Sequence, residues 1–465
     1  MKRIFQTILT TVILLGILSS CEKFLSLAPV SQANTEDFYK TPADLDNAVI
    51  AAYKYQKYIF SADFCSQHLL DEQRSDNTGY SNLTDEVDNF TKDTGKEWYM
   101  WSWDKCYKAI YTCNVAIEKA AGITMSDELM NQYLGELKFL RAITYFELVR
   151  NYGGVPLVLE TPKSLARDAV NVSRNTVSEV YDQIVADLQF AEANLPVSFT
   201  DGKYVGRATK GAANGYLGKV YLTLGKKSEA EAALRKVLAY GYELLPQYAD
   251  VFDANNGNNK EVVFELQFKS TTDACPFIYM FTSMQVDVKP GLSYNKGTQD
   301  LFDAFEAGDP RRDLTMAKDN VGLYYCVKYK DPAANPVSDA NNNIPLMRYS
   351  EVLLLLSESI GESSESYNLI NQVRNRVGLA NISSSTPGTF AQKLLHERRI
   401  ELAYENHRWH DLLRFGVAIE VMNAFFVKEK NGAVTIGPDD LLFPIPNFTL
   451  LNNPNLVQNP GYPGS

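Results

Sequence analysis

The segment ATKGAANGYLGKVYLTLGKKSEAEAALRKVLAYG, residues 208–241, constrains the fold more than any other part of the chain. Its apolar and small residues recur at the spacing of a helical repeat, which predicts two helices folded back on each other. Small residues such as Gly218 let the two helices approach closely, and large residues such as Tyr221 fill the remaining space. The segment therefore predicts a helical hairpin.

The spacing of this hairpin matches part of the tetratricopeptide pattern. Leu217, Gly218 and Tyr221 reproduce its L-G-x-x-Y portion, Ala230 follows nine residues later, and Leu234 stands at the usual Phe position. The Trp and Pro of the full pattern are missing. The earlier segment YLGELKFLRAITYFELV repeats the theme loosely. We expect a mainly α fold on a scaffold of tetratricopeptide-like helical hairpins.

Other parts of the chain follow the same helical pattern, with one interruption. A helix is expected after Thr41, with Pro42 in its first turn, and another after a cap at Asn175 or Thr176 with Glu179 as capping-box partner. Residues 245–345 change to polar, turn-rich loops with short strands, of which EVVFELQF is the clearest. Helices return from about residue 348, and the C-terminal segment is rich in Pro and Asn.

The N-terminus resembles a bacterial lipoprotein signal. Lys2 and Arg3 precede an apolar run over residues 4–18, and LSSC follows at residues 18–21. Cleavage before Cys21 would remove a signal peptide of residues 1–20 and leave Cys21 to be acylated. The alternatives are an uncleaved anchor and an ordinary secretory signal. The apolar run is shorter than the ~20 residues of a spanning helix, so we expect a tethered protein.

Charge and cysteine content exclude several classes of protein. The chain has a net charge of −11, which argues against a nucleic-acid partner because no basic footprint is present. The six cysteines include Cys21, so five remain. Five cysteines cannot all pair, so the count does not indicate a disulfide framework. Cys106 and Cys113 lie about 10 Å apart along one predicted helix, too far to bridge. We expect buried thiols.

Residues 396–416, HERRIELAYENHRWHDLLRFG, look like an active site. Three histidines stand there among arginines and acidic residues, one of which is Asp411. On one continuous helix, His396 and His407 would stand about 16 Å apart, too far to share a metal. His407 and His410 could meet, but nearby arginines would oppose a cation. Arginines facing carboxylates on adjacent helices can instead fix helix register. We expect no metal, no cofactor and no catalysis, since no nucleophile or phosphate-binding motif is present either.

Aromatic and polar residues gather early in the chain, in DEQRSDNTGY (residues 71–80) and KEWYMWSWDKCY (residues 96–107). Aromatic faces stack on sugar rings, and Asp, Asn and Arg side chains bond hydroxyl groups, so loops that carry both are candidate glycan sites. The alternative is that these rings plug the helical core, which we favour for Trp103. The candidate ligand residues are Arg74, Asp76, Asn77, Tyr80, Trp98, Tyr99 and Trp101, with Tyr294 in SYNKG as a further candidate.

Several segments, taken in their order along the chain, resemble those of the SusD/RagB family of surface lipoproteins from Bacteroidota. The segments that carry the resemblance are Cys21 followed by FLSLAP, then WDKCYKAIYTCN, FLRAITYFELVRNYGGVPLV, RATKGAANGYLGKVYLTLG, RYSEVLLLLSES, INQVRNRVGL, ERRIELAYENHRWHDLLRFG and IPNFTLLNNPNLVQNPGY. Asn406 stands where the family usually has Gly, and Asn is among the residues that best tolerate a left-handed backbone.

The resemblance implies a SusD-like N-terminal helical region over residues 21–245 and a RagB/SusD C-terminal region over residues 246–465. It implies a lipid-anchored protein of the outer membrane, facing the cell exterior, that captures a glycan without cleaving it. Its implied partner is a SusC-like TonB-dependent transporter. Peptide or other nutrient binding of the RagB type is the main alternative, and a glycoside hydrolase or a tetratricopeptide protein-interaction scaffold are the others.

Overall fold

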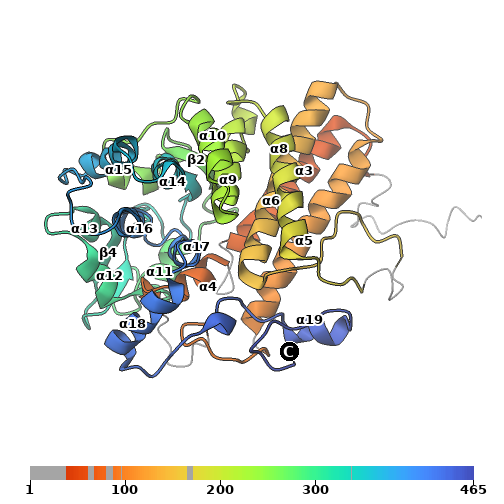
Figure 1. The fold of residues 1–465 in the computed structure, drawn as a ribbon. Helices are drawn as coiled ribbons and strands as arrows, with labels where there is room; N and C mark the ends of the chain where they lie inside the picture. Colours follow the sequence, from red (N-terminus) through yellow and green to blue (C-terminus); the bar gives the residue numbers. More distant parts are fainter. Residues whose placement is uncertain are drawn as a thin grey trace, which may run out of the picture.

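The computed structural model describes residues 38–60, 67–79, 87–95, 97–164, 171–336 and 338–464. Cys21 and Tyr80 lie outside these residues, as does the side chain of Trp98. The described part is mainly helical, as expected (Figure 1). Its sixteen α-helices are α3 (Pro42–Phe60), α4 (Gln67–Gln73), α5 (Glu97–Ala120), α6 (Asp127–Tyr152), α8 (Val177–Asn194), α9 (Lys210–Thr223), α10 (Lys227–Val237), α11 (Phe277–Phe281), α12 (Gln299–Ala304), α13 (Arg311–Thr315), α14 (Tyr349–Ile360), α15 (Ser364–Arg376), α16 (Phe390–Glu401), α17 (Arg408–Arg414), α18 (Ala418–Lys430) and α19 (Asn447–Asn452).

The long helices form one side of the molecule. Helices α3, α5, α6, α8 and α9 lie side by side in Figure 1, and α10 continues the series toward α14. The predicted hairpin at residues 208–241 is confirmed as α9 and α10. A Cβ atom on Gly218 would stand 2.4 Å from Cγ of Leu234, so only glycine permits this approach of the two helices.

Local signals at the helix ends act as the sequence predicts. Thr176 caps α8, and Glu179 completes a capping box with it. Helix α6 ends at Tyr152, and Gly153 follows with φ +73°. Helix α5 differs from the prediction because it already begins at Glu97, so the tryptophans expected before the helix lie on its first turns.

Most of the short strands lie in the loop region of residues 245–345 or at its end, as expected, and β1 lies near the N-terminus. The strands are β1 (Thr78–Gly79), β2 (Val262–Leu266), β3 (Lys296–Gly297), β4 (Met316–Lys318), β5 (Tyr324–Cys326) and β6 (Ile344–Arg348). Strands β2 and β6 form an antiparallel pair whose residues are all buried, and the other four form a sheet in the order β1-β3-β5-β4. Short 3-10 helices, η2 (Gly202–Tyr204), η3 (Tyr248–Phe252) and η4 (Pro438–Asp440), complete the described elements.

A buried ion network joins the C-terminal helices to β2 and β6. Arg348 donates to Glu261 at 2.6 Å, to Glu401 at 2.9 Å and to Glu405 at 2.6 Å. Arg311 donates to both Glu397 and Glu401, at 2.7 and 3.0 Å. Burial alone would raise the pKa of Glu401, but the surrounding arginines hold it well below its usual value. The arginine and carboxylate pairs fix the register of these helices, as the sequence predicted.

The segment from residue 394 to 414 is not one continuous helix. Helix α16 ends at Glu401 and α17 begins at Arg408, and between them Tyr404 and Asn406 have φ of +62° and +64°. Asn406 therefore adopts the left-handed conformation expected where the family usually has Gly. The two backbone N–H groups at these positions donate to the carboxylate of Glu72 at 3.1 and 3.0 Å, which stabilises the break.

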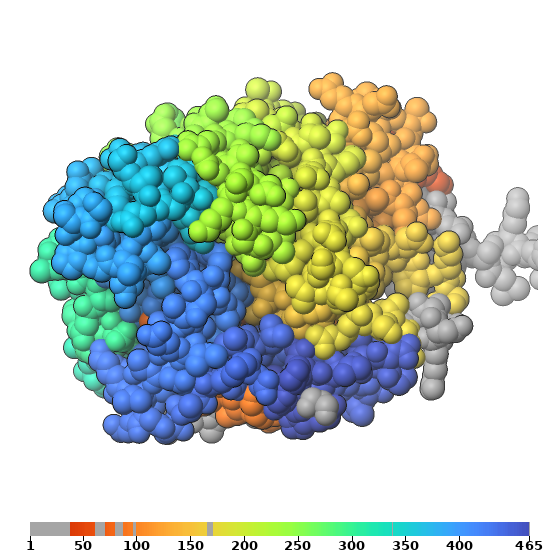
Figure 2. All heavy atoms as spheres, in the orientation of Figure 1, coloured from red at the N-terminus to blue at the C-terminus, as the bar shows by residue number. Residues whose placement is uncertain are grey.

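The C-terminal segment closes the lower side of the molecule. Trp409, Phe425 and Phe426 belong to a small second core, separate from the main core, which extends from α3 to the C-terminal segment. In Figure 2 this part of the chain, shown in blue, forms a band along the lower edge.

The thiols of Cys106, Cys113, Cys275 and Cys326 are free and buried, as expected. Among the described helices, none combines the length and the apolar character that crossing a membrane requires.

Candidate functional site

Two cavities adjoin at the segment of residues 205–207, where α3, the loop between α8 and α9, and β2 meet. We call the first the tyrosine cavity, because Tyr204, Tyr240 and Tyr242 line it, and its volume is about 280 Å³. We call the second the lysine cavity, because Lys54, Lys57 and Lys203 line it, and its volume is about 270 Å³. Val205, Gly206, Arg207 and Glu265 line both cavities.

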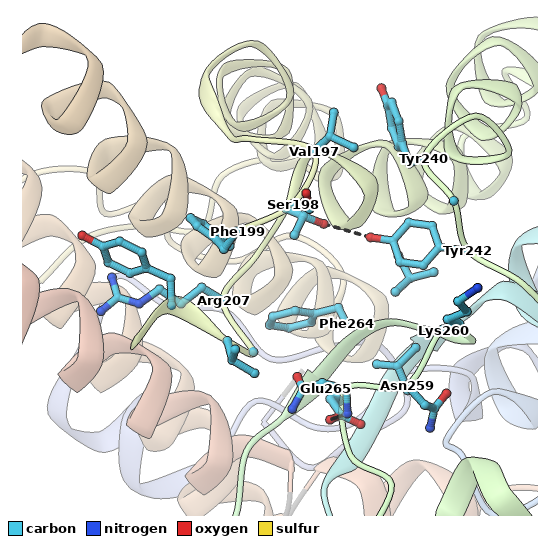
Figure 3. Close-up of a pocket in the computed structure, with 18 residues that line it drawn as sticks. Val197, Ser198, Phe199, Arg207, Tyr240, Tyr242, Asn259, Lys260, Phe264 and Glu265 are labelled. Carbon is cyan, nitrogen blue, oxygen red and sulfur yellow. Dashed lines mark hydrogen bonds between the residues drawn. The ribbon is translucent and has the colours of Figure 1, made fainter. Parts of the chain in front are cut away.

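The tyrosine cavity combines aromatic rings with polar groups. In Figure 3, Tyr242 lies across the opening from Phe199 and Phe264, and Tyr240 points upward above it. Lys260 lies at the right of the view and Asn259 at the lower right. The hydroxyl of Tyr242 lies 3.0 Å from Oγ1 of Thr209, which fixes the ring. Burial raises the pKa of Tyr242, so this hydroxyl stays protonated at neutral pH and can take part in hydrogen bonds.

The lysine cavity has an apolar wall and a charged rim. Tyr53 and the half-exposed Ile50 come from α3, and Val205, 54% exposed, faces them from the loop. Lys57 pairs with Asp273 at 2.6 Å, and its amine lies 4.8 Å from the ring centre of Phe268. The cavity can therefore hold a ligand that is apolar on one side and polar on the other.

A close backbone approach joins the two cavities. A Cβ atom on Gly206 would lie 2.4 Å from Cγ of Gln267, and the φ of Gly206 is +83°. Both facts require glycine here, since a side chain would displace Gln267. Gln267 exchanges two amide hydrogen bonds with Asn258, at 2.8 and 3.1 Å. This pair fixes the wall that the cavities share.

Arg207 is held from behind by carboxylates. It pairs with Asp46 at 2.7 Å and with Glu136 at 3.5 Å, and its guanidinium lies 4.7 Å from the ring centre of Tyr204. Burial alone would lower the pKa of Arg207, but these two carboxylates raise it. Tyr53 donates to Glu136 at 2.9 Å and accepts the N–H of Ala208 at 2.8 Å. The side chains beneath the cavities are therefore tightly positioned.

The lining residues suit binding better than catalysis. The two carboxylates are engaged: Glu265 accepts the amide of Asn343 at 2.6 Å and the N–H of Asn258 at 2.7 Å, and Asp273 is paired with Lys57. Burial raises the pKa of Glu265. A hydrolytic pair needs two carboxyl groups that flank the bond to be cleaved, with one free to donate a proton. Glu265 is 4% exposed and Asp273 is paired with Lys57, so these two groups do not match that arrangement.

The structure places the three described ligand candidates of segment 71–79 inside the protein. Arg74 is 2% exposed, and its guanidinium lies between the rings of Trp409 and Phe443, 4.5 and 4.4 Å from their centres. Asp76 pairs with Arg408 and Arg399, and Asn77 accepts a hydrogen bond from Arg399 at 2.8 Å. The expectation of an exposed loop is corrected here, because the partners of these side chains are distant in sequence.

The remaining candidates lie in two different places. Tyr294 is half-buried and stands beside segment 71–79, because β3 pairs with β1 directly after it. Trp101 is half-buried on α5, whose N-terminal end contacts α19. Tyr99, on the same helix, is also inside the protein, because it is 3% exposed and its ring centre lies 5.2 Å from that of Phe443. The ligand role of Trp101 and Tyr294 stays a prediction, as does that of Tyr80 and Trp98.

One group of side chains could approach a metal ion. Asp71, Glu147 and His410 offer ligand atoms within 4.8 Å of one another among the described residues. His410 already bonds Asp71 at 2.9 Å, and Arg150 pairs with Glu147. Burial lowers the pKa of His410 to about 4, with a further contribution from the positive charge of Arg150. The same charge would oppose a cation, so we assign no metal to this group.

The cavity residues were not among the sequence-predicted candidates. The segment SFTDGKYVGRATK at residues 198–210 carries aromatic, cationic and glycine residues together, which is a weak signal of a binding loop. Its partners on α3 and β2 are distant in sequence, so the cavities become apparent only in the folded chain.

Two family models match the chain. The model described as the SusD family matches residues 306–462, and the model described as starch-binding associating with outer membrane matches residues 23–222. Together they cover both the long helices and the C-terminal segment that contains the buried arginines.

Individual relatives match over most of their length. SusD-like protein P2 of Formosa agariphila is 28% identical over 98% of this chain and 99% of its own. The starch-binding protein SusD of Bacteroides thetaiotaomicron is 24% identical over 75% of this chain and 76% of its own. A solved laminarin-binding SusD-like protein superposes with a TM-score of 0.80 at 27% identity, covering 91% of this chain and all (100%) of that one.

Proposed function

This chain belongs to the SusD family, and we propose that it is a non-enzymatic nutrient-binding lipoprotein that captures a glycan at the cell surface. Relatives named for starch and laminarin binding support the choice of ligand class. The observation that carries the proposal is the pair of cavities, in which aromatic rings and hydrogen-bonding side chains line one surface.

The tyrosine cavity supplies the interactions that a sugar ring needs. The partly exposed rings of Tyr204, Tyr240 and Tyr242 can stack on the apolar faces of a pyranose. The exposed side chain of Asn258 and that of Lys260 can bond its hydroxyl groups. Trp101 and Tyr294 are proposed as additional contacts of a longer chain.

The binding test measures the affinity of the purified protein for neutral and acidic oligosaccharides by calorimetry. Tyr242→Ala and Tyr240→Ala should each weaken affinity at least ~10-fold, the loss expected for an aromatic anchor. Tyr221→Ala is the matched control, since Tyr221 is a partly buried tyrosine of α9 that does not line either cavity. Binding of a peptide panel without binding of any glycan would reverse the ligand class.

The same oligosaccharides test whether the protein is an enzyme. After prolonged incubation with the protein they should be recovered intact by chromatography. New reducing ends that depend on Glu265 or Asp273 would overturn the non-enzymatic part of the proposal.

The anchor and the partner are inferred from the sequence and the family. The segment before Cys21 and the outer-membrane description of the matching family support acylation at Cys21 and an outward-facing position. A clickable fatty acid should label the expressed protein and not its Cys21→Ala variant, and equal labelling of both would refute the anchor. A SusC-like TonB-dependent transporter should co-purify from outer membranes solubilised in mild detergent.

A further inference from the structure

The side chains that line the two cavities have the opposite balance of charged residues to the whole chain. The chain carries 45 basic and 56 acidic residues, a net charge of −11. The side chains that line the cavities include five basic residues and only two acidic ones. The basic residues are Lys54, Lys57, Lys203, Arg207 and Lys260, and the acidic ones are Glu265 and Asp273. A cleft lined by charges of one sign raises the local concentration of ligands that carry the opposite charge.

Not all of these charges can face a ligand. Lys57 is paired with Asp273 inside the lysine cavity, and Arg207 with Asp46 and Glu136 behind it. Glu265 is 4% exposed and is bonded to Asn343. The acidic lining groups are therefore already engaged, while part of the basic charge remains.

Lys260, in the tyrosine cavity, pairs with Glu243 at 3.1 Å. In the lysine cavity the remaining charge lies on Lys54 and Lys203, which come from opposite walls. Lys54 is exposed on α3, and its amine lies 5.9 Å from the ring centre of Tyr58. Lys203 stands 3.6 Å from Asp201, and these two side chains are 59% and 55% exposed. Such exposed pairs are weak and screened, so an anionic ligand can compete with Asp201 for Lys203.

We propose that the lysine cavity binds an acidic sugar residue, with a carboxylate or sulfate group held by Lys54 and Lys203. The apolar face of the ring lies against Tyr53 and Val205, and the next sugar enters the tyrosine cavity across the segment of residues 205–207 that both cavities share. The ammonium group of a lysine is compact and has three N–H donors, so two lysines can bind one anionic group from different sides. This assignment rests on the proposed glycan-binding function.

The experiment compares three oligosaccharides of similar length on the purified protein: a neutral laminarin fragment, an oligogalacturonate and a sulfated galactan fragment. We expect at least one acidic fragment to bind ~10-fold or more tightly than the neutral one at low salt, and its affinity to fall as NaCl rises. The two acidic fragments distinguish carboxylate from sulfate recognition.

The Lys54→Gln/Lys203→Gln variant should lose most of that preference and most of the salt dependence. The Lys226→Gln/Lys227→Gln variant makes the same change of charge at exposed lysines that do not line the cavities, and it should bind as the wild type does. Equal binding of neutral and acidic fragments, or equal behaviour of the two variants, would overturn the inference and leave the proposed function standing. Failure of all three fragments and of further glycans to bind would refute both.

Discussion

Arg408 and Asp76 form a two-point ion pair inside the protein, in which Nε and Nη2 of the arginine donate to the two carboxylate oxygens at 2.7 Å each. The pair joins the start of α17 to the segment after α4, across 332 residues of sequence. Arg408 belongs to the segment of residues 396–416, which resembles an active site because it is rich in histidine, arginine and acidic residues. The same residue types also form the ion pairs that hold buried helices together, as Arg408 does here.

Asp76→Ala should lower the free energy of unfolding by about 3–5 kcal/mol, since it leaves Arg408 buried without its carboxylate. Urea denaturation at pH 7 measures the change. Glu365→Ala is the control, because its pair with Arg235 lies at the surface, and it should cost much less. A similar loss of unfolding free energy in both variants would show that the buried pair stabilises the protein no more than a surface pair does.

Gly218→Ala should destabilise the hairpin of α9 and α10 by about 1–3 kcal/mol, because the new methyl group would overlap Leu234. The control is Gly202→Ala, at a glycine where a Cβ atom would meet nothing within 4 Å. In a Leu234→Ala background the cost of Gly218→Ala should largely disappear, as a double-mutant cycle would show. A cost that persists in that background would indicate a backbone effect.

Features that depend on neighbouring residues were predictable from the sequence. The capping box of Thr176 and Glu179, the stop at Gly153 and the left-handed Asn406 each depend on a few adjacent positions. The hairpin of α9 and α10 was predictable for the same reason, since its contacts are close in sequence.

Features that depend on distant partners were not predictable. Asp76 reads as an exposed loop residue because the arginines that bury it come more than 300 residues later. The cavities combine α3, the loop before α9 and β2, so no single segment contains them. The early start of α5 has a related cause, since Tyr99 and Trp103 are held by the buried rings of Phe443 and Tyr152.

Trp101→Ala and Tyr294→Ala should each weaken glycan binding several-fold, which is less than the ~10-fold expected for Tyr242→Ala. Both rings are half-buried and lie apart from the cavities, so each can offer only part of its face to a long ligand. Calorimetry with fragments of increasing length measures the difference. If these two variants lose affinity and Tyr242→Ala does not, the ligand binds at Trp101 and Tyr294 and not in the cavities, and the cavity proposal is wrong.

Glu136→Gln should stabilise the protein increasingly as the pH rises from 5 to 8. Burial raises the pKa of Glu136 to about 7, above the value of 4.5 that is usual for a glutamate. The folded state therefore holds the proton more tightly than the unfolded state between these two values. The stability that this proton provides is complete below pH ~4.5 and is lost as the pH rises through 7. Glutamine resembles the protonated acid and keeps an acceptor for Tyr53.

The difference in Tm between Glu136→Gln and wild type, measured from pH 5 to 8, should therefore grow over that range and level off above 7. Using the difference removes the contributions of other groups, such as Glu72, whose pKa burial also raises to about 7. Glu231→Gln makes the same change of charge at an exposed ion pair on the outer side of α10 and is the matched control. A constant difference for Glu136→Gln would mean that Glu136 is ionised throughout, with Arg207 compensating its charge.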